Sequence, residues 1–354
     1  MRVKIHSSEL NRMLKTVMPC VDTRGLAVGN IELACEGNMF LVRGGGFSMR
    51  AMAGTPVMGV DDECFCVDGT VFQKVCALCG GEVEISSDGK VCTVKGNGRT
   101  RIPIVEANAV DIAPIEGNTV SVKGEDLIRA YRSVGYAISQ DESRPVLTGI
   151  LAESDGMTLK FVALDGFQMS MEEVNCEGSA MKVVIPGAFL KLAAGSVTAG
   201  ETVEFTTDGH TIQAETDSMR LKGGLLIGEY VDYGRILPKE HKTQCMVRTE
   251  NMRMALKSGT AVNSKQSLVK LDVGQSVVKV MSNSEAADFE ADVDCQTNGD
   301  GLQIAFNEKY LMNTMNSVED ENAVMLFNSA VSPMIVRTED GHGTRLVLPV
   351  RVAR

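Results

Sequence analysis

Hydrophobic and polar residues alternate along most of the chain, in short runs that Gly, Asn or Asp interrupt. Two long examples are EVEISSDGKVCTVKGNGR from residue 82 and VEFTTDGHTIQAETDSMRLKGG from residue 203. Period-two alternation broken by Asp-Gly or Asn-Gly is typical of antiparallel hairpins that have one buried face. The sequence therefore predicts antiparallel sheets over much of its length.

A helical pattern follows a short strand and a polar break at three places. The segments are VKIHSSELNRMLKTV (3–17), VSVKGEDLIRAYRSV (120–134) and MVRTENMRMALKSG (246–259). Their equivalent apolar positions, Leu10, Leu127 and Met252, lie 117 and 125 residues apart. Spacing that recurs in this way indicates an internal repeat.

A second strand and helix follow within each repeat. The segments are CVDGTVFQKVCAL from 66, VIPGAFLKLAAG from 184 and AFNEKYLMNTMN from 305, and their anchors Val71, Phe189 and Tyr310 lie 118 and 121 residues apart. RTRIPIV from 99 and TRLVLPVR from 344 each form a strand pattern with a late proline. We predict an α+β fold of three repeated domains, 1–116, 117–240 and 241–354, each with two helices against antiparallel sheets.

Basic residues recur on the polar faces of these helices. A helical wheel places Arg12 and Lys15 opposite the apolar face of the first helix, and Arg129 and Arg132 occupy the same repeat positions. The third repeat has Lys257 there, and the second helices add Lys74, Lys191 and Lys309. On one helix such cations are usually only solvated, but their recurrence favours a common basic surface. We expect Arg12 and Arg129 to be exposed on it.

The charge balance limits what that surface can be. The 354 residues carry a formal net charge of -11, with a pI near 5.0, which argues against a protein that is basic all round and wraps nucleic acid. A basic surface confined to the helices would still hold a phosphate backbone without reading sequence. No apolar run approaches the roughly 20 residues of a membrane span, and MRVKIHSSEL has no signal-peptide core, so we expect a cytoplasmic protein without membrane contact.

Ten cysteines raise the question of a redox or metal site. Cys76 and Cys79 form a C-x-x-C motif, but the helical pattern begins before it, whereas a thioredoxin-like motif stands at a helix start. A zinc site needs further ligands, and the histidines are scattered: His6, His210, His241 and His342. We predict reduced thiols, no metal and no cofactor.

Five segments in order resemble the bacterial sliding clamp family, the beta subunit of DNA polymerase III. They are FVALDGFQMS (161–170), VVIPGAFLKLA (183–193), YVDYGRILP (230–238), LQIAFNEKYLMNTMN (302–316) and LVLPVRV (346–352). The resemblance extends over nearly the whole chain and is loosest in the first repeat.

The resemblance implies a head-to-tail homodimer that closes into a ring around duplex DNA and confers processivity, with helices lining the hole and no catalytic activity. It adds Arg24 to the basic residues as a DNA contact. The candidate contacts to the DNA backbone are Arg12, Lys15, Arg24, Lys74, Arg129, Arg132, Lys191 and Lys257.

The resemblance also implies an apolar pocket for short peptides of the replicative polymerase, the clamp loader and repair enzymes, for example a Gln-x-x-Leu-Phe type peptide. Carried over position by position, the pocket consists of Leu147, Leu164, Gly166, Phe167, Gln168, Met169, Val231, Arg235, Ile236, Val331, Leu346, Leu348, Pro349, Val350 and Arg351. Phe167 and Gln168 stand where the family usually has His and Arg, and Val231 replaces a proline, which leaves the preferred peptide open.

Two other interpretations compete with this one. An enzyme could use Asp165, Asp232 or the cysteines, although no nucleophile, base and orienting group stand at motif spacing. A clamp-like scaffold that binds proteins without encircling DNA is the second alternative.

Overall fold

The computed structural model describes residues 1–22, 29–58, 61–106, 110–262, 268–339 and 341–351. The chain divides into two compact units. The first consists of Met1–Ile128 with Cys176–Leu225, and the second of Arg129–Asn175 with Leu226–Arg354. The three-domain boundaries expected from the repeats stay a prediction.

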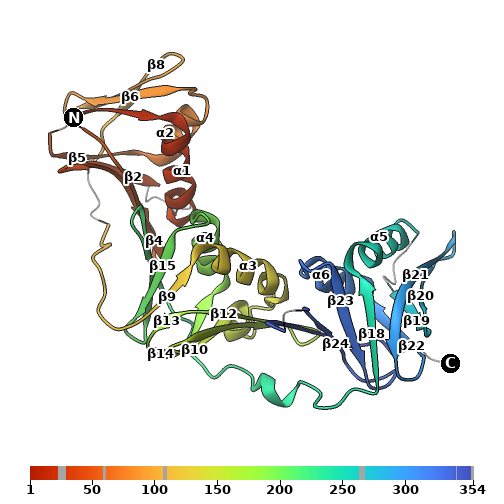
Figure 1. The fold of residues 1–354 in the computed structure, drawn as a ribbon. Coiled ribbons are helices and arrows are strands. Elements are labelled where there is room, and N and C mark those ends of the chain that lie inside the picture. The colour runs from red at the N-terminus through yellow and green to blue at the C-terminus, as the bar shows by residue number, and fades with distance from the viewer. Residues whose placement is uncertain (23–28, 59–60, 107–109, 263–267, 340, 352–354) are drawn as a thin grey trace. The chain divides into compact units, whose positions relative to one another are not determined.

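The first unit contains two antiparallel sheets (Figure 1). The smaller has the order β1 (Arg2–His6), β6 (Glu82–Ser87), β7 (Val91–Lys95), β8 (Arg99–Pro103). The larger has the order β13 (Glu177–Gly178), β9 (Asn118–Lys123), β15 (Thr202–Thr207), β16 (Thr211–Thr216), β17 (Met219–Gly224), β4 (Met49–Pro56), β3 (Met39–Gly45), β2 (Asn30–Glu36), β5 (Glu63–Asp68). The pairing of β17 with β4 joins strands of two repeats into one sheet.

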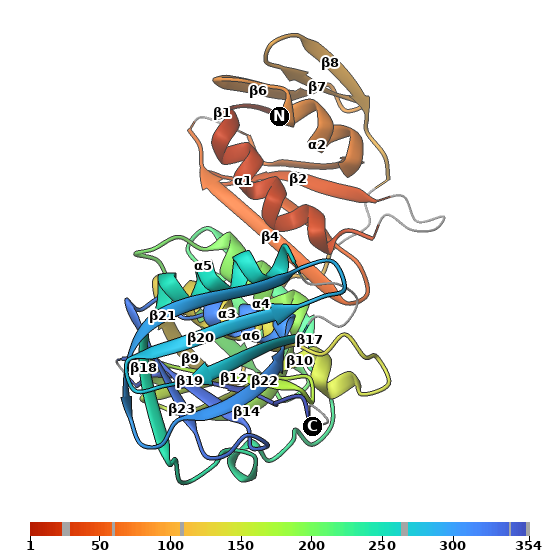
Figure 2. The ribbon, with the colours of Figure 1, turned by 90° about the vertical axis from the view of Figure 1, so that its right-hand side faces the viewer.

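The helices of the first unit begin directly after strands. They are α1 (Ser7–Val17), α2 (Gly69–Ala77) and α4 (Gly187–Ser196), the last after β14 (Ala180–Pro186), while α3 (Gly124–Val134) follows β9 and begins in this unit. The Asp68 carboxylate accepts a hydrogen bond from the backbone N–H of Val71 at 2.9 Å, which caps the start of α2. Helix α1 packs on β3, β4, α2 and α4 (Figure 2).

The second unit is built on a series of antiparallel strands that runs through two repeats. Their order is β10 (Gly149–Asp155), β11 (Thr158–Leu164), β12 (Gln168–Asn175), β25 (Gly343–Val347), β24 (Met334–Arg337), β23 (Asn322–Phe327), β18 (Thr243–Arg248), β21 (Asp288–Asn298), β20 (Val277–Asn283), β19 (Leu268–Val273), β22 (Leu302–Asn307). Strand β12 pairs with β25, so the end of the chain adds to strands that come before residue 176.

Helices α5 (Thr249–Thr260) and α6 (Glu308–Asn316) pack on each other in the second unit. Asn307 caps α6, because its side-chain oxygen accepts hydrogen bonds from the backbone N–H groups of Lys309 and Tyr310. Short 3₁₀ turns at Gly135–Ala137, Pro145–Thr148 and Tyr233–Arg235 complete the unit, and a further one at Met18–Cys20 follows α1.

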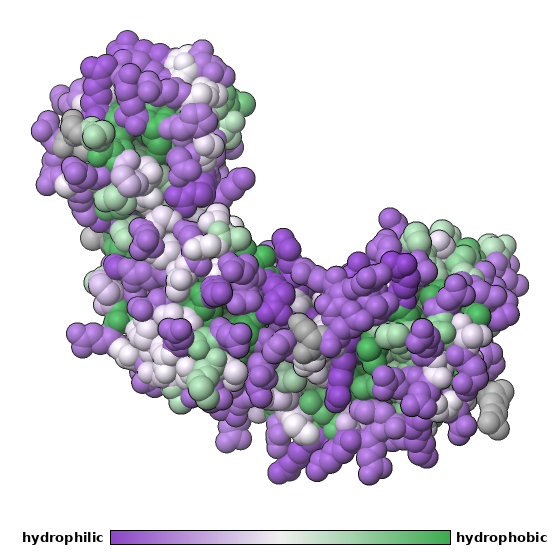
Figure 3. All heavy atoms as spheres, viewed as in Figure 1, coloured by the Kyte–Doolittle hydropathy of each residue, from purple (hydrophilic) through white to green (hydrophobic). Residues whose placement is uncertain are grey.

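The structure confirms the α+β pattern of short strands and paired helices. All strand pairs within the described residues are antiparallel, and each of the six predicted helices is present. Leu10, Met13, Leu14 and Val17 are at most 1% exposed, as the helical wheel predicts. Hydrophilic side chains predominate on the surface in the view of Figure 3, with small hydrophobic areas between them.

Candidate functional site

The lysines of the predicted basic surface are exposed and lack side-chain partners within the described residues. Lys15 lies on α1, Lys74 on α2, Lys191 on α4 and Lys257 on α5. An ammonium group without a protein partner is free to approach a phosphate. Arg24 lies outside the described residues.

The three arginines behave differently from these lysines. Arg12 is only 29% exposed, and its guanidinium pairs with Glu9 at 3.1 Å and donates to the Ser218 hydroxyl at 3.2 Å. Arg132 is 69% exposed and lies 3.6 Å from a Glu319 oxygen.

Arg129 is 31% exposed, and its Nη1 donates to the Glu172 carboxylate at 2.7 Å. The expectation that Arg12 and Arg129 are exposed is therefore wrong. Glu9 lies on the same helix as Arg12, but Ser218 and Glu172 lie outside α1 and α3, so a wheel of either helix alone does not contain them.

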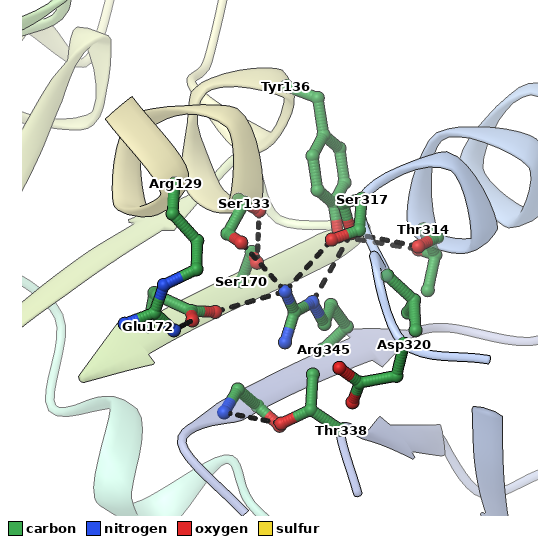
Figure 4. Close-up of polar contacts among 12 residues, drawn as sticks. Arg129, Ser133, Tyr136, Ser170, Glu172, Thr314, Ser317, Asp320, Thr338 and Arg345 are labelled. Atoms are coloured by element: carbon green, nitrogen blue, oxygen red, sulfur yellow. Dashed lines mark hydrogen bonds and ion pairs between the residues drawn. The ribbon is translucent and has the colours of Figure 1, made fainter. Parts of the chain in front are cut away.

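A buried ionic network lies beneath Arg129 (Figure 4). Glu172 of β12 is 2% exposed and Arg345 of β25 is 1% exposed, and their side chains form an ion pair at 3.0 Å. Arg345 also donates to the Ser133 hydroxyl at 2.8 Å, the Ser317 hydroxyl at 3.2 Å and the Ser317 carbonyl at 3.0 Å. The guanidinium thus joins α3, β12 and the residue that follows α6.

No sequence pattern predicted this network. The available signal is a charge of each sign inside apolar strand patterns, Glu172 in QMSMEEV and Arg345 in TRLVLPV. A buried charge needs an opposite partner, but the sequence does not say which one.

The residues predicted to form the peptide pocket all belong to the second unit. Antiparallel pairing sets Met169 opposite Leu346 and Gln168 opposite Val347. The Leu348 N–H then donates to the Phe167 carbonyl at 2.9 Å. Strand β12 and the end of the chain therefore lie side by side.

The last residues continue along another strand of the same unit. Pro349 forms an isolated antiparallel bridge with Phe306, and the Val350 N–H donates to the Ala305 carbonyl at 2.7 Å. This pairing accounts for the apolar, strand-like pattern that continues to Arg351. Val350 is 39% exposed, and Arg351 is exposed as well.

Residues 226–238 carry three further predicted pocket positions. Val231, Arg235 and Ile236 are exposed. Tyr230 and Tyr233 hold the segment in place, since their hydroxyls donate to the Val162 carbonyl at 3.3 Å and to the Glu153 carboxylate at 2.6 Å. Burial raises the pKa of both phenols, and for Tyr233 the neighbouring Glu153 carboxylate raises it further.

The remaining pocket positions differ in exposure. Leu147, Leu164, Met169 and Leu346 are at most 5% exposed, Leu348 and Pro349 are half-buried, and Gly166 and Val331 are exposed. The buried leucines and Met169 can form the floor of an apolar site, with the exposed residues at its rim.

Two models of the DNA polymerase III beta subunit match the chain, the central domain over residues 121–232 and the C-terminal domain over 234–351. Together they cover more than half of it. The chain belongs to the DNA polymerase III beta-subunit family.

Relatives and solved structures agree with this membership. The beta sliding clamp of Caulobacter vibrioides is 24% identical over 372 residues, which cover 99% of this chain and all of that protein. The beta sliding clamp of Streptococcus pneumoniae is 26% identical over 281 residues, 76% of this chain and 72% of that protein. The beta subunit of Thermotoga maritima has the same fold, with a TM-score of 0.89 at 22% identity over 99% of this chain and all of that one.

A Pseudomonas aeruginosa clamp crystallised with griselimycin is also similar. Its TM-score is 0.91 at 21% identity, over 99% of this chain and all of that one. These likenesses confirm the clamp fold that the sequence predicted.

Phe167 and Gln168, the two positions where the resemblance led us to expect His and Arg, differ in exposure. Phe167 is 57% exposed and stacks on Tyr310 of α6, with ring centroids 5.6 Å apart. Gln168 is 4% exposed, and its amide donates to the Asp165 carboxylate at 2.9 Å and to the Tyr136 carbonyl at 3.3 Å. Of the two residues, Phe167 is therefore the one that faces the surface.

Asp165 has a structural role at this turn. Its carboxylate accepts hydrogen bonds from the backbone N–H groups of Phe167 and Gln168 at 2.8 and 2.9 Å, while Gly166 adopts a φ of 95°. An Asp-Gly turn of this kind orients Phe167.

The cysteines lie mostly in the core. Cys76 is fully buried and Cys79 half-buried, and all ten cysteines are free thiols. Burial raises the pKa of Cys76, and that of Cys92 to about 12, which disfavours the reactive thiolate. Within the described residues no three His, Cys, Asp or Glu side chains gather into a metal-binding group, and no helix is long and apolar enough to cross a membrane.

Proposed function

We propose that this protein is a DNA sliding clamp, in which two copies of the chain close around duplex DNA and hold partner proteins there. The observation that carries the proposal is the set of exposed, unpartnered lysines on equivalent helices, within the described residues of a chain from the beta-subunit family. Lys and Arg hold a phosphate backbone regardless of sequence, as sliding requires. The clamp is a non-catalytic subunit with three domains in each chain.

Retention on closed DNA tests this proposal. The protein is loaded onto nicked circular DNA with a clamp loader, and bound and free protein are separated by gel filtration. We expect retention on the circle, rapid loss when the circle is cut, and the mass of a dimer in sedimentation. Equal loss from cut and intact circles would instead favour a scaffold that does not encircle DNA.

The second half of the proposal is that Leu164, Phe167, Met169, Leu346 and Leu348 belong to a pocket for short partner peptides. A Leu or Phe side chain buried there would contribute roughly 1.5–3 kcal/mol before ordering costs. The fixed backbone of the β12 end and the final residues would position such a peptide.

Fluorescence anisotropy with a labelled Gln-x-x-Leu-Phe peptide tests the pocket. We expect saturable binding that is lost when the chain ends after Val347. This truncation leaves β25 intact and removes the hydrogen bonds of Leu348 and Val350. Phe47→Ala, at a fully exposed aromatic residue of the first unit, is the control that should bind normally. A truncated, folded protein with undiminished affinity would exclude this pocket.

A further inference from the structure

The buried ion pair of Glu172 and Arg345 lies on the opposite face of the strands from the predicted pocket. Successive side chains of a strand point to opposite faces. Arg345 is paired with Ser170, whose hydroxyl donates to the Ser133 carbonyl of α3 at 2.6 Å. The next residue, Leu346, is paired with Met169 on the other face. The network and the pocket therefore share two strands.

A buried ion pair is a poor source of stability, because both charges lose their hydration. It is, however, an effective determinant of strand register. A slip of one residue would move every side chain of β25 to the other face. Arg345 would then leave Glu172, and its buried charge would lack a partner, while Glu172 would keep only its bond to Arg129. An apolar pair at these positions would carry no such penalty.

The surroundings fit one placement of the guanidinium. Its Nε and Nη2 groups donate to Glu172, Ser133 and Ser317, which lie far apart in the sequence, while Nη1 is buried without a hydrogen-bond partner among the described residues. The Arg345 guanidinium also occupies the space that a side chain at position 343 would need, which is why glycine fits there. A Cβ added at Gly343 would collide with it and would lie 2.8 Å from a Glu172 oxygen.

We propose that Glu172 and Arg345 are positioning residues of the peptide site. By fixing the register of β25 against β12, they set Leu346 and Leu348 beside Met169 and Phe167, where a partner peptide is to bind. This inference rests on the proposed peptide-binding function. Arg129 extends the network toward the surface through its own bond to Glu172.

The test compares peptide affinity with stability in variants of the full chain. Glu172→Gln and Arg345→Met each remove one charge, and Glu172→Met/Arg345→Met replaces the pair by two apolar side chains. We expect the single variants to lose stability and the double variant to recover much of it. Affinity for the labelled Gln-x-x-Leu-Phe peptide should fall about tenfold in all three, because the double variant packs without specifying register.

Arg253→Met is the matched control. Arg253 of α5 also donates to backbone carbonyls at the end of α6, those of Met315 at 3.0 Å and of Val318, and pairs with Glu250, but it forms no hydrogen bond or ion pair with β12 or β25 in the described part of the chain. It should lower stability and leave peptide affinity unchanged. The inference would be overturned if peptide affinity fell in proportion to the loss of stability in every variant, so that Arg253→Met lost as much affinity as the charge variants.

The outcomes separate this inference from the peptide-binding function itself. If the wild-type protein does not bind the peptide, the proposed pocket fails. If it binds and the folded double variant binds equally well, the positioning role fails. Should none of the charge variants fold, Ser133→Ala decides, since it removes one acceptor of Arg345 without a charge: a loss of about two- to threefold supports positioning, and wild-type affinity overturns it.

Discussion

At the scale of single residues, equivalent repeat positions do not imply equivalent roles. Arg129 and Arg132 both lie on α3, yet Arg129 bonds to buried Glu172 at 2.7 Å while Arg132 is 69% exposed. An arginine that already neutralises a buried carboxylate is less able to bind phosphate than a free lysine is. The two residues therefore differ in what their loss would cost.

Charge reversal separates these two arginines. Arg129→Glu places a second carboxylate against buried Glu172, and we expect the free energy of unfolding to fall by about 2–3 kcal/mol. Arg132→Glu should change it by less than about 0.5 kcal/mol, because that side chain is solvated. Urea denaturation of both variants provides the measurement. Equal stability of the two would contradict the structural role of Arg129.

The sequence predicts the burial and contacts of a residue better when its neighbours in space are also close in the sequence. Leu10, Met13 and Val17 follow from helical periodicity alone, and all three are buried. Arg12 pairs with nearby Glu9 but also with Ser218, which is 206 residues away, and Glu172 is 173 residues away from Arg345. No local pattern encodes interactions of that span.

At the scale of elements, the sequence predicted which segments form strands and helices but not all strand partners. Alternation predicts strands within residues 203–224, but it did not predict the strand at 49–56 or its pairing with 219–224 across two repeats. The same holds for β12 and β25, whose pairing creates both the ionic network and the predicted pocket. Alternation with a period of two shows which face of a strand is buried, but it does not show which strand pairs with it.

The ladder β1–β6–β7 allows a prediction about pH. Glu84 accepts hydrogen bonds from Lys95 and Arg2, each at 2.6 Å, and these cations lower the pKa of its carboxyl to about 2. The native state thus favours the ionised form more than the unfolded chain does. The stabilisation is complete above the unfolded pKa, near 4.3, and is lost as the pH falls toward 2.

NMR titration of the Glu84 side chain would measure this pKa. Lys95→Ala should raise it toward the ordinary value, and the variant should lose less stability than the wild type between pH 4 and 2. Lys90→Ala, in the turn that follows β6, serves as the control for the removal of a positive charge. An ordinary pKa for Glu84 in the wild-type protein would contradict the stabilisation of its carboxylate by Lys95 and Arg2.

At the scale of the whole molecule, the net charge of the chain is negative, whereas the helix surfaces carry positive charges. The formal net charge is -11, while helices of the three repeats present lysines without partners in the described structure. A negative molecule with basic helices would repel DNA in general and bind it only where those helices face the duplex. Composition alone argued against binding of nucleic acid. The basic surface that could bind DNA was predicted only from the recurrence of cations on the repeated helices.

Neutralising the helix lysines tests this separation of charge. A variant with Gln in place of Lys15, Lys74, Lys191 and Lys257 should bind a short DNA duplex more weakly than the wild type does. The dependence of binding on salt should become less steep, by up to about 0.9 in the logarithmic slope for each phosphate that no longer meets a lysine. The matched control changes Lys90, Lys239, Lys242 and Lys270 to Gln, four exposed lysines outside the helices. Because both variants change net charge equally, long-range repulsion is the same, and only the placement of the charges differs. Equal salt slopes in the two variants would mean that the helix lysines do not bind the phosphates.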